Sequence, residues 1–149
     1  MIWKEAYLET HVLSADPMEL VCLLYRHATE AVREARQRVR AGDIAGRAQA
    51  ISKTIGILGE LNASLDHSSG GTISTSLEQL YSYITMRLTE ANVRQQEAPL
   101  AEVESLLGTL GQAWEETRAQ QAALKAPATP PVAAWQTSNL EPAANAWSA

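Results

Sequence analysis

Apolar residues recur every three or four positions between residues 44 and 92, in two arms separated by a short polar stretch. Residues three and four apart lie on one face of a helix, so each arm predicts an amphipathic helix. Residues 66–71 are rich in turn formers and long enough only to reverse the chain, so the two helices are expected to run antiparallel. The stripes are Ile44, Ala48, Ile51, Ile55, Leu58 and Leu65 in the first arm, and Ile73, Leu77, Leu80, Ile84, Leu88 and Ala91 in the second.

A helix before these arms begins at Asp16 and Pro17. An N-cap Asp accepts hydrogen bonds from free amides of the first turn, Pro fits the first helical position, and Glu19 completes a capping-box pattern. We expect this helix to run to about Arg40, with Gly42 as its C-terminal stop.

Asp43 is the expected N-cap of the next helix. The third helix is expected from about residue 72 to 95, and a fourth from Pro99 to residue 120 or 124. Tyr81 and Tyr83 point about 200° apart on the third helix, so they cannot both face the core. The sequence therefore predicts an all-α fold, an antiparallel up-down four-helix bundle, in a domain spanning residues 1–124.

The two ends of the chain have a different character. Residues 1–15 carry Ile2, Trp3 and Leu8 without a long helical stripe, which predicts either a strap that closes one end of the core or an exposed binding surface. Residues 125–149 are rich in Pro and Ala, a composition typical of a disordered tail. Trp135 and Trp147 leave open a short docking motif in that tail, beside the alternative of an inert extension.

Four glycines lie inside expected helices, and each costs up to about 1 kcal/mol relative to Ala. Gly56 and Gly59 lie in the second helix, and Gly108 and Gly111 repeat their spacing in the fourth. Two explanations are open: close approach of neighbouring helices, or a shallow surface that admits a partner.

Composition narrows the function classes. The net charge is −5, which gives no electrostatic reason to bind nucleic acid. No apolar run reaches membrane-spanning length, and the single Cys22 permits a reducing compartment, so a cytoplasmic protein without membrane insertion is expected. Arg33, Arg36, Arg38 and Arg40 crowd the end of the first helix, as a docking patch or as a solvated face that complements the helix dipole.

Signals for catalysis and for metal binding are lacking. His11, His27 and His67 fall on three different elements, and neither a phosphate loop nor a nucleophile elbow is present. We therefore expect no cofactor, no metal and no enzymatic activity, and rate an enzyme with a diffuse site as the weakest of the alternatives.

Several short motifs together carry a family resemblance. The stretch Tyr7-x4-Val12-x-Ser14-Ala15-x-Pro17-x-Glu19-Leu20, followed by Leu24-Tyr25, resembles the opening of the FliS-type flagellar export chaperones. Further similar motifs are Ser64-Leu65-Asp66, Gly70-Gly71-x-Ile73, Leu77-x2-Leu80-Tyr81-x-Tyr83, Leu88-x2-Ala91-Asn92 and Ala113-Trp114-Glu115. Their order and spacing, over residues 6–118, are more specific than any single motif.

The resemblance implies a cytoplasmic four-helix bundle that binds the disordered C-terminal region of flagellin. It implies that flagellin is kept monomeric and handed to the membrane export gate of the flagellar type III system. The chaperone itself is expected to be a monomer or a weak homodimer. The alternative is a structural or oligomerising bundle whose exposed stripes meet other copies of itself.

A client peptide can lay its apolar face into hydrophobic grooves between bundle helices. The second helix has a wider apolar stripe than one seam needs, because Ile57 and Leu61 add to it, so its residues are expected to divide between core and groove. The N-terminal strap is expected to cover such a groove. The candidate client-binding residues are Tyr7, Val12, Ile51, Ile55, Leu58, Leu77, Tyr81 and Ile84.

Overall fold

A computed structural model describes residues 16–125 of the chain. In this part, four helices and no strand are formed: α2 (Pro17–Ala41), α3 (Ile44–Ala63), α4 (His67–Arg94) and α5 (Ala98–Lys125). The expectations for the N-terminal strap and the C-terminal tail concern residues 1–15 and 126–149, which lie outside the described residues.

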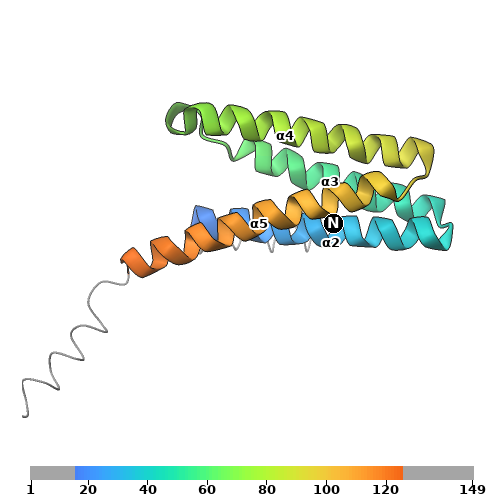
Figure 1. The fold of residues 1–149 in the computed structure, drawn as a ribbon, viewed down its shortest axis with the longest axis horizontal. Helices are drawn as coiled ribbons and strands as arrows, with labels where there is room; N and C mark the ends of the chain where they lie inside the picture. The colour runs from blue at the N-terminus through green and yellow to red at the C-terminus, as the bar shows by residue number, and fades with distance from the viewer. Residues whose placement is uncertain (1–15, 126–149) are drawn as a thin grey trace, which may run out of the picture. The chain divides into compact units, whose positions relative to one another are not determined.

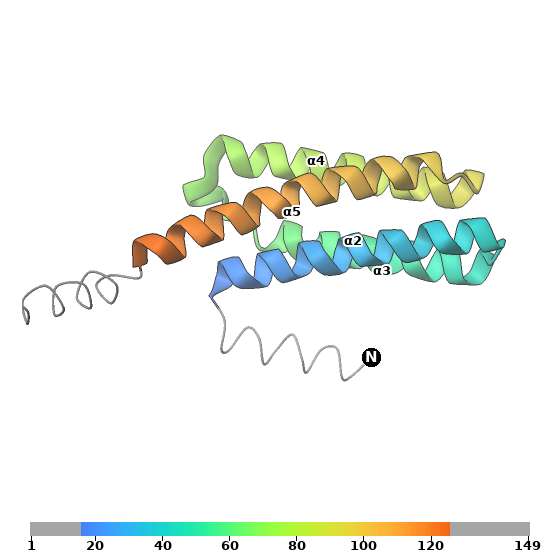
Figure 2. The ribbon, with the colours of Figure 1, turned by 60° about the horizontal axis from the view of Figure 1, so that its bottom comes forward.

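The chain divides into two compact units, residues 1–115 and 116–149. In the first unit, α2, α3, α4 and the larger part of α5 run alternately up and down, each beginning where the preceding one ended (Figure 1). Turning the molecule shows α2 beside α3 and α4 beside α5 (Figure 2). The predicted antiparallel four-helix bundle is confirmed. In the second unit, residues 116–124 continue α5 with mostly exposed side chains.

The caps predicted for both ends of α2 and for the start of α3 are also confirmed. The Asp16 carboxylate accepts a hydrogen bond from the Met18 amide at 2.8 Å. Gly42 ends α2 in the left-handed conformation, with φ of 70°, and donates its amide to the last carbonyls of the helix. Asp43 then caps α3 by accepting from the Gly46 amide at 2.9 Å.

The third helix was predicted to begin near Thr72, where its regular part does begin, but α4 starts one turn earlier. Helix α4 begins at His67, because the Asp66 carboxylate accepts the amides of Ser68 and Ser69 and so builds a helical turn. Hydrogen bonds from the hydroxyls of these two serines, and then from their amides, lower the pKa of Asp66 to about 2. Gly71, with φ of 52°, kinks the helix, and the regular part of α4 follows it.

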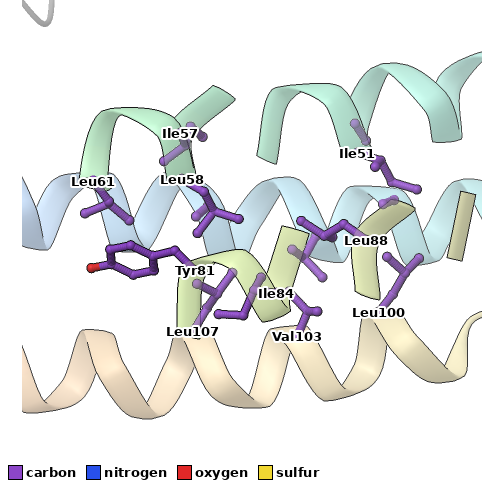
Figure 3. Packing of buried hydrophobic residues seen from close by; sticks show 14 of the residues in the cluster. Ile51, Ile57, Leu58, Leu61, Tyr81, Ile84, Leu88, Leu100, Val103 and Leu107 are labelled. Atoms are coloured by element: carbon purple, nitrogen blue, oxygen red, sulfur yellow. The ribbon is translucent and has the colours of Figure 1, made fainter. Parts of the chain in front are cut away.

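The core is one apolar cluster shared by the four helices. Its members point toward one another from α3, α4 and α5 (Figure 3). Complete burial of a side chain of this size contributes roughly 1.5–3 kcal/mol, so the cluster dominates the stability of the bundle. The largest fully buried apolar members include Tyr25, Val32, Ile51, Leu58, Leu61, Ile84, Leu88, Leu100, Val103 and Leu107.

Three residues of the predicted stripes do not belong to this core. Ile44 is 58% exposed and Ile73 is 70% exposed, and Ala48 is half-buried outside the cluster. Ile57, which the stripe prediction treated as an addition, is buried instead.

Most of the four glycines inside the helices do not lie where two helices approach closely. A Cβ added at Gly56, Gly59 or Gly108 would meet no atom within 4 Å, so that explanation is wrong for these three positions. Only Gly111 supports it, since its Cβ would lie 3.3 Å from the Tyr25 Cβ. The open surface at Gly56 and Gly59 leaves the second explanation, a surface that admits a partner.

Candidate functional site

The structure separates the eight candidate residues. Tyr7 and Val12 lie outside the described residues. Ile55 and Leu77 are half-buried and pack against the core from its edge. The other four lie inside the core, where a partner cannot touch them while the bundle is closed: Ile51, Leu58, Tyr81 and Ile84.

Tyr81 shows why the core position matters. Its hydroxyl lies 2.5 Å from the hydroxyl of Tyr25, so a hydrogen bond joins α4 to α2 across the core. Burial raises the pKa of Tyr25 and of Tyr81, which keeps both phenols neutral. Tyr83 is exposed and donates to Glu102 of α5, so the expectation that the two tyrosines of α4 face different ways is confirmed.

The seam between α2 and α5 is closed by ion pairs. Arg36 lies 3.0 Å from Glu97 and 3.3 Å from Glu104, and Arg26 lies 3.0 Å from Glu115. Arg40 also pairs with Glu97, and this hydrogen bond is the main reason that the pKa of Glu97 is lowered. The basic cluster of α2 therefore chiefly forms ion pairs with α5. The sequence pattern of α2 did not reveal this role.

The seam between α3 and α4 has a different rim. Residues three or four positions apart lie near one another on a helix surface, and such a set lies on each of these two helices. None of these residues is charged, and all are exposed or half-buried. We call this surface the α3–α4 face: Ala48, Ser52, Ile55 and Gly59 of α3, with Ser82, Thr85, Met86 and Thr89 of α4.

The α3–α4 face is more apolar than its residue types suggest. The hydroxyls of Thr85 and Thr89 donate to the carbonyls of Tyr81 and Thr85 in their own helix, at 2.8 and 2.9 Å. These hydroxyls are therefore engaged within the helix. Met86 is 57% exposed on this face.

Two more exposed apolar side chains extend the face toward one end of the bundle. Ile44 begins α3, and Val93 lies seven residues after Met86 on α4. Near this end Arg47 of α3 donates to the side-chain carbonyl of Asn92 of α4 at 3.0 Å, which places the two helix ends together. Exposed apolar side chains are typical of a site for another protein where they lie on one surface.

The structure offers no sign of other site classes in the part of the chain it describes. Between residues 16 and 125, no three potential metal ligands of the His, Cys, Asp or Glu type lie together. None of the four helices is long and apolar enough to span a bilayer. The geometry thus defines a class: a helical bundle with an uncharged, partly apolar face on α3 and α4.

Comparison with known proteins gives the family. Residues 3–121 match the model of the flagellar protein FliS, so the chain belongs to the FliS family. It is 36% identical to the flagellar secretion chaperone FliS of Salmonella typhimurium over 115 residues, which cover 76% of this chain and 85% of that protein. The resemblance inferred from the sequence motifs is confirmed.

Two further relatives agree. The flagellar secretion chaperone FliSB of Pseudomonas aeruginosa is 33% identical over 113 residues, covering 76% of this chain and 90% of that protein. The flagellar secretion chaperone FliS of Bacillus subtilis is 31% identical over 111 residues, covering 74% and 82%. These relatives are named as chaperones, and the family is not one of enzymes.

Proposed function

We propose that the chain is a flagellar secretion chaperone that binds the disordered C-terminal region of flagellin in the cytoplasm. It prevents premature polymerisation and supports delivery of its client to the membrane export gate of the flagellar type III system. Membership of the FliS family supports the chaperone role. The α3–α4 face is the observation that supports a helical protein client.

The proposed contact follows from the side chains on this face. Small residues such as Ala48, Ser52 and Gly59 let a client helix come close, while Ile55 and Met86 receive its apolar side chains. No charged group of the face loses its water when the client docks, which avoids a desolvation cost. The client loses conformational entropy as it orders, so the complex can be specific and still release its cargo.

The buried candidates have an indirect part in this proposal. Ile51 and Leu58 of α3 pack with Ile84 of α4 in the core and hold the two helices at a fixed spacing. They position the face without touching the client. Ile55, at the edge of the core, is the one predicted residue that belongs to the face itself.

Calorimetric titration with a peptide of the flagellin C-terminal region tests the proposal. Met86→Asp places a charge in the middle of the face and is expected to weaken binding at least about ten-fold, since an unpaired charge would be desolvated. Gln37→Asp adds the same charge to the exposed outer side of α2 and is the matched control. Both variants should keep the helical circular dichroism of the wild type.

The outcomes separate the alternatives. If both variants bind like the wild type, the client docks elsewhere. If the wild-type protein binds no flagellin peptide but forms stable oligomers that Met86→Asp dissolves, the face serves self-association and the chaperone proposal is wrong.

A further inference from the structure

Three polar or charged residues are buried in the described part of the bundle, and one of them differs from the others. Thr54 donates its hydroxyl to the Ala50 carbonyl at 2.9 Å, and Ser74 donates to the Asp66 carbonyl at 2.9 Å. Each thus has its partner in the chain. The third residue is Arg47, only 7% exposed, whose guanidinium carries five N–H donors.

Arg47 uses one of these donors. Its Nε group donates to the Asn92 side-chain carbonyl, a neutral acceptor. Among residues 16–125, neither terminal nitrogen of the guanidinium has an acceptor, and no carboxylate forms an ion pair with it. A buried charge is normally paired, because an unpaired one has lost its water without compensation.

The acidic residues around this end of the bundle are committed elsewhere. Asp43, four residues before Arg47, accepts from Arg38 and from the Gly46 amide. Glu90 pairs with Arg87 and Arg94, and Glu97 pairs with Arg36 and Arg40. The described part of the chain therefore supplies acidic groups to seven of its other arginines but not to the buried one.

Arg47 and its unused N–H donors lie next to the α3–α4 face. Arg47 lies between the first turns of α3 and the last turns of α4, directly before Ala48 of the α3–α4 face. The exposed side chains of Ile44 and Val93 belong to the same end of these helices. A partner seated on the face therefore ends beside this cation, and its anion would have to approach through the 7% of Arg47 that remains exposed.

We propose that Arg47 is an anion anchor that receives a carboxylate of the docked client, next to the apolar contacts of the α3–α4 face. This inference rests on the proposed function and specifies the client's chemistry: a helical segment whose apolar side is followed by an acidic side chain or by the chain's terminal carboxylate. A carboxylate matches the forked donors of a guanidinium with two parallel hydrogen bonds. A water molecule would accept hydrogen bonds but would leave the charge uncompensated.

The variant Arg47→Met tests the anchor, because Met keeps an apolar stem of similar length and removes the charge. We expect the flagellin C-terminal peptide to bind about ten- to a hundred-fold more weakly, as for the loss of a charge-assisted pair. The unfolding temperature should stay the same or rise, since an apolar side chain replaces an under-paired buried charge. Arg47→Lys keeps the charge without the fork and should recover part of the affinity.

Lys53→Met is the matched control. It removes the same charge from an exposed position of α3, so any general effect of net charge on an acidic peptide appears in both variants. Equal weakening by Lys53→Met and Arg47→Met overturns the anchor. So does wild-type affinity in Arg47→Met.

The peptide identifies the carboxylate. One version carries amides in place of its acidic side chains and another carries an amidated C-terminus. The peptide version that lacks the anchored carboxylate should bind the wild-type protein as weakly as the unmodified peptide binds Arg47→Met. This version should also bind the wild-type protein and Arg47→Met with equal affinity. If Arg47→Met weakens both modified peptides as much as the unmodified one, the anchor is wrong while the proposed function stands. If the wild-type protein binds no peptide at all, both proposals fall.

Discussion

The seams α2–α5 and α3–α4 lie in the same bundle and share one core, yet their rims are opposite in character. Along α2–α5, arginines of one helix meet glutamates of the other, as in Arg36 with Glu97 and Glu104. Along α3–α4, the eight residues of the α3–α4 face are uncharged, and α3 packs less extensively on α4 than on α2. The charged side chains of the α2–α5 rim already have partners within the chain, whereas the apolar side chains of the α3–α4 face are free to contact another protein. The comparison teaches that the packing of a bundle and its availability to a partner are set by different residues.

The largest effect on stability is expected in the core. Both seams share the core, so they should not differ there. Ile84→Ala leaves a cavity among fully buried side chains and should lower the free energy of unfolding by about 2–5 kcal/mol. Met86→Ala, two residues further along α4 but on the outer face, should change it by less than about 0.5 kcal/mol. Urea unfolding followed by circular dichroism measures both. Similar losses for the two variants would mean that Met86 is part of the core and that the face is not free.

A smaller effect is expected at the bond that crosses the core between the seams. Tyr25→Phe or Tyr81→Phe leaves the other hydroxyl buried without its partner, at a cost of roughly 1–3 kcal/mol. The double variant removes both hydroxyls and should be less destabilised than the two single changes added together. Urea unfolding of all four proteins gives the coupling energy. Additive losses would show that the hydroxyl pair does not act as a unit.

The smallest effect on stability is expected from pH, and it should differ between the rims of the two seams. The hydrogen bond from Arg40, with a further one from Arg36, lowers the pKa of Glu97 below its unfolded value of about 4.3. The folded state therefore gains stability from this carboxylate above that value and loses it as pH falls through the folded pKa. The urea midpoint of the wild type should drop more between pH 6 and 3 than that of Glu97→Gln. Added salt should narrow the difference, because the pair is on the surface.

The α3–α4 rim supplies the control for this experiment. Arg47 has no carboxylate partner among residues 16–125, so Arg47→Met should follow the pH dependence of the wild type. A flatter profile for Arg47→Met would reveal a carboxylate that depends on Arg47 within the chain.

The sequence was a good guide to the helices because their ends carry explicit signals. Asp16, Gly42 and Asp43 each act through a local hydrogen bond or backbone conformation that the residue type favours. The start of α4 was missed because two local signals compete there: Asp66 begins a helix, and Gly71 interrupts it four residues after His67.

The candidate site was less accessible to sequence reasoning. Periodicity identifies the apolar side of a helix, and that side is the core, which is why Ile51 and Ile84 were selected although they are buried. The surface left for a partner is marked instead by what it lacks: charge and bulk, as at Ser52 and Gly59. Arg47 was missed because a sequence does not show which arginine lacks a carboxylate.

The up-and-down order of the helices also has a consequence for how the bundle assembles. Three of its seams join helices that follow one another along the chain, while the α2–α5 seam joins residues 57 to 89 positions apart. Closing a loop of that length costs the most chain entropy, so this seam is expected to form last. Opposite charges on α2 and α5 attract beyond contact distance, which favours encounter of the two edges in the partly folded chain. The ion pairs would then act as a guide for the closing step of folding as well as a fastening of the finished bundle.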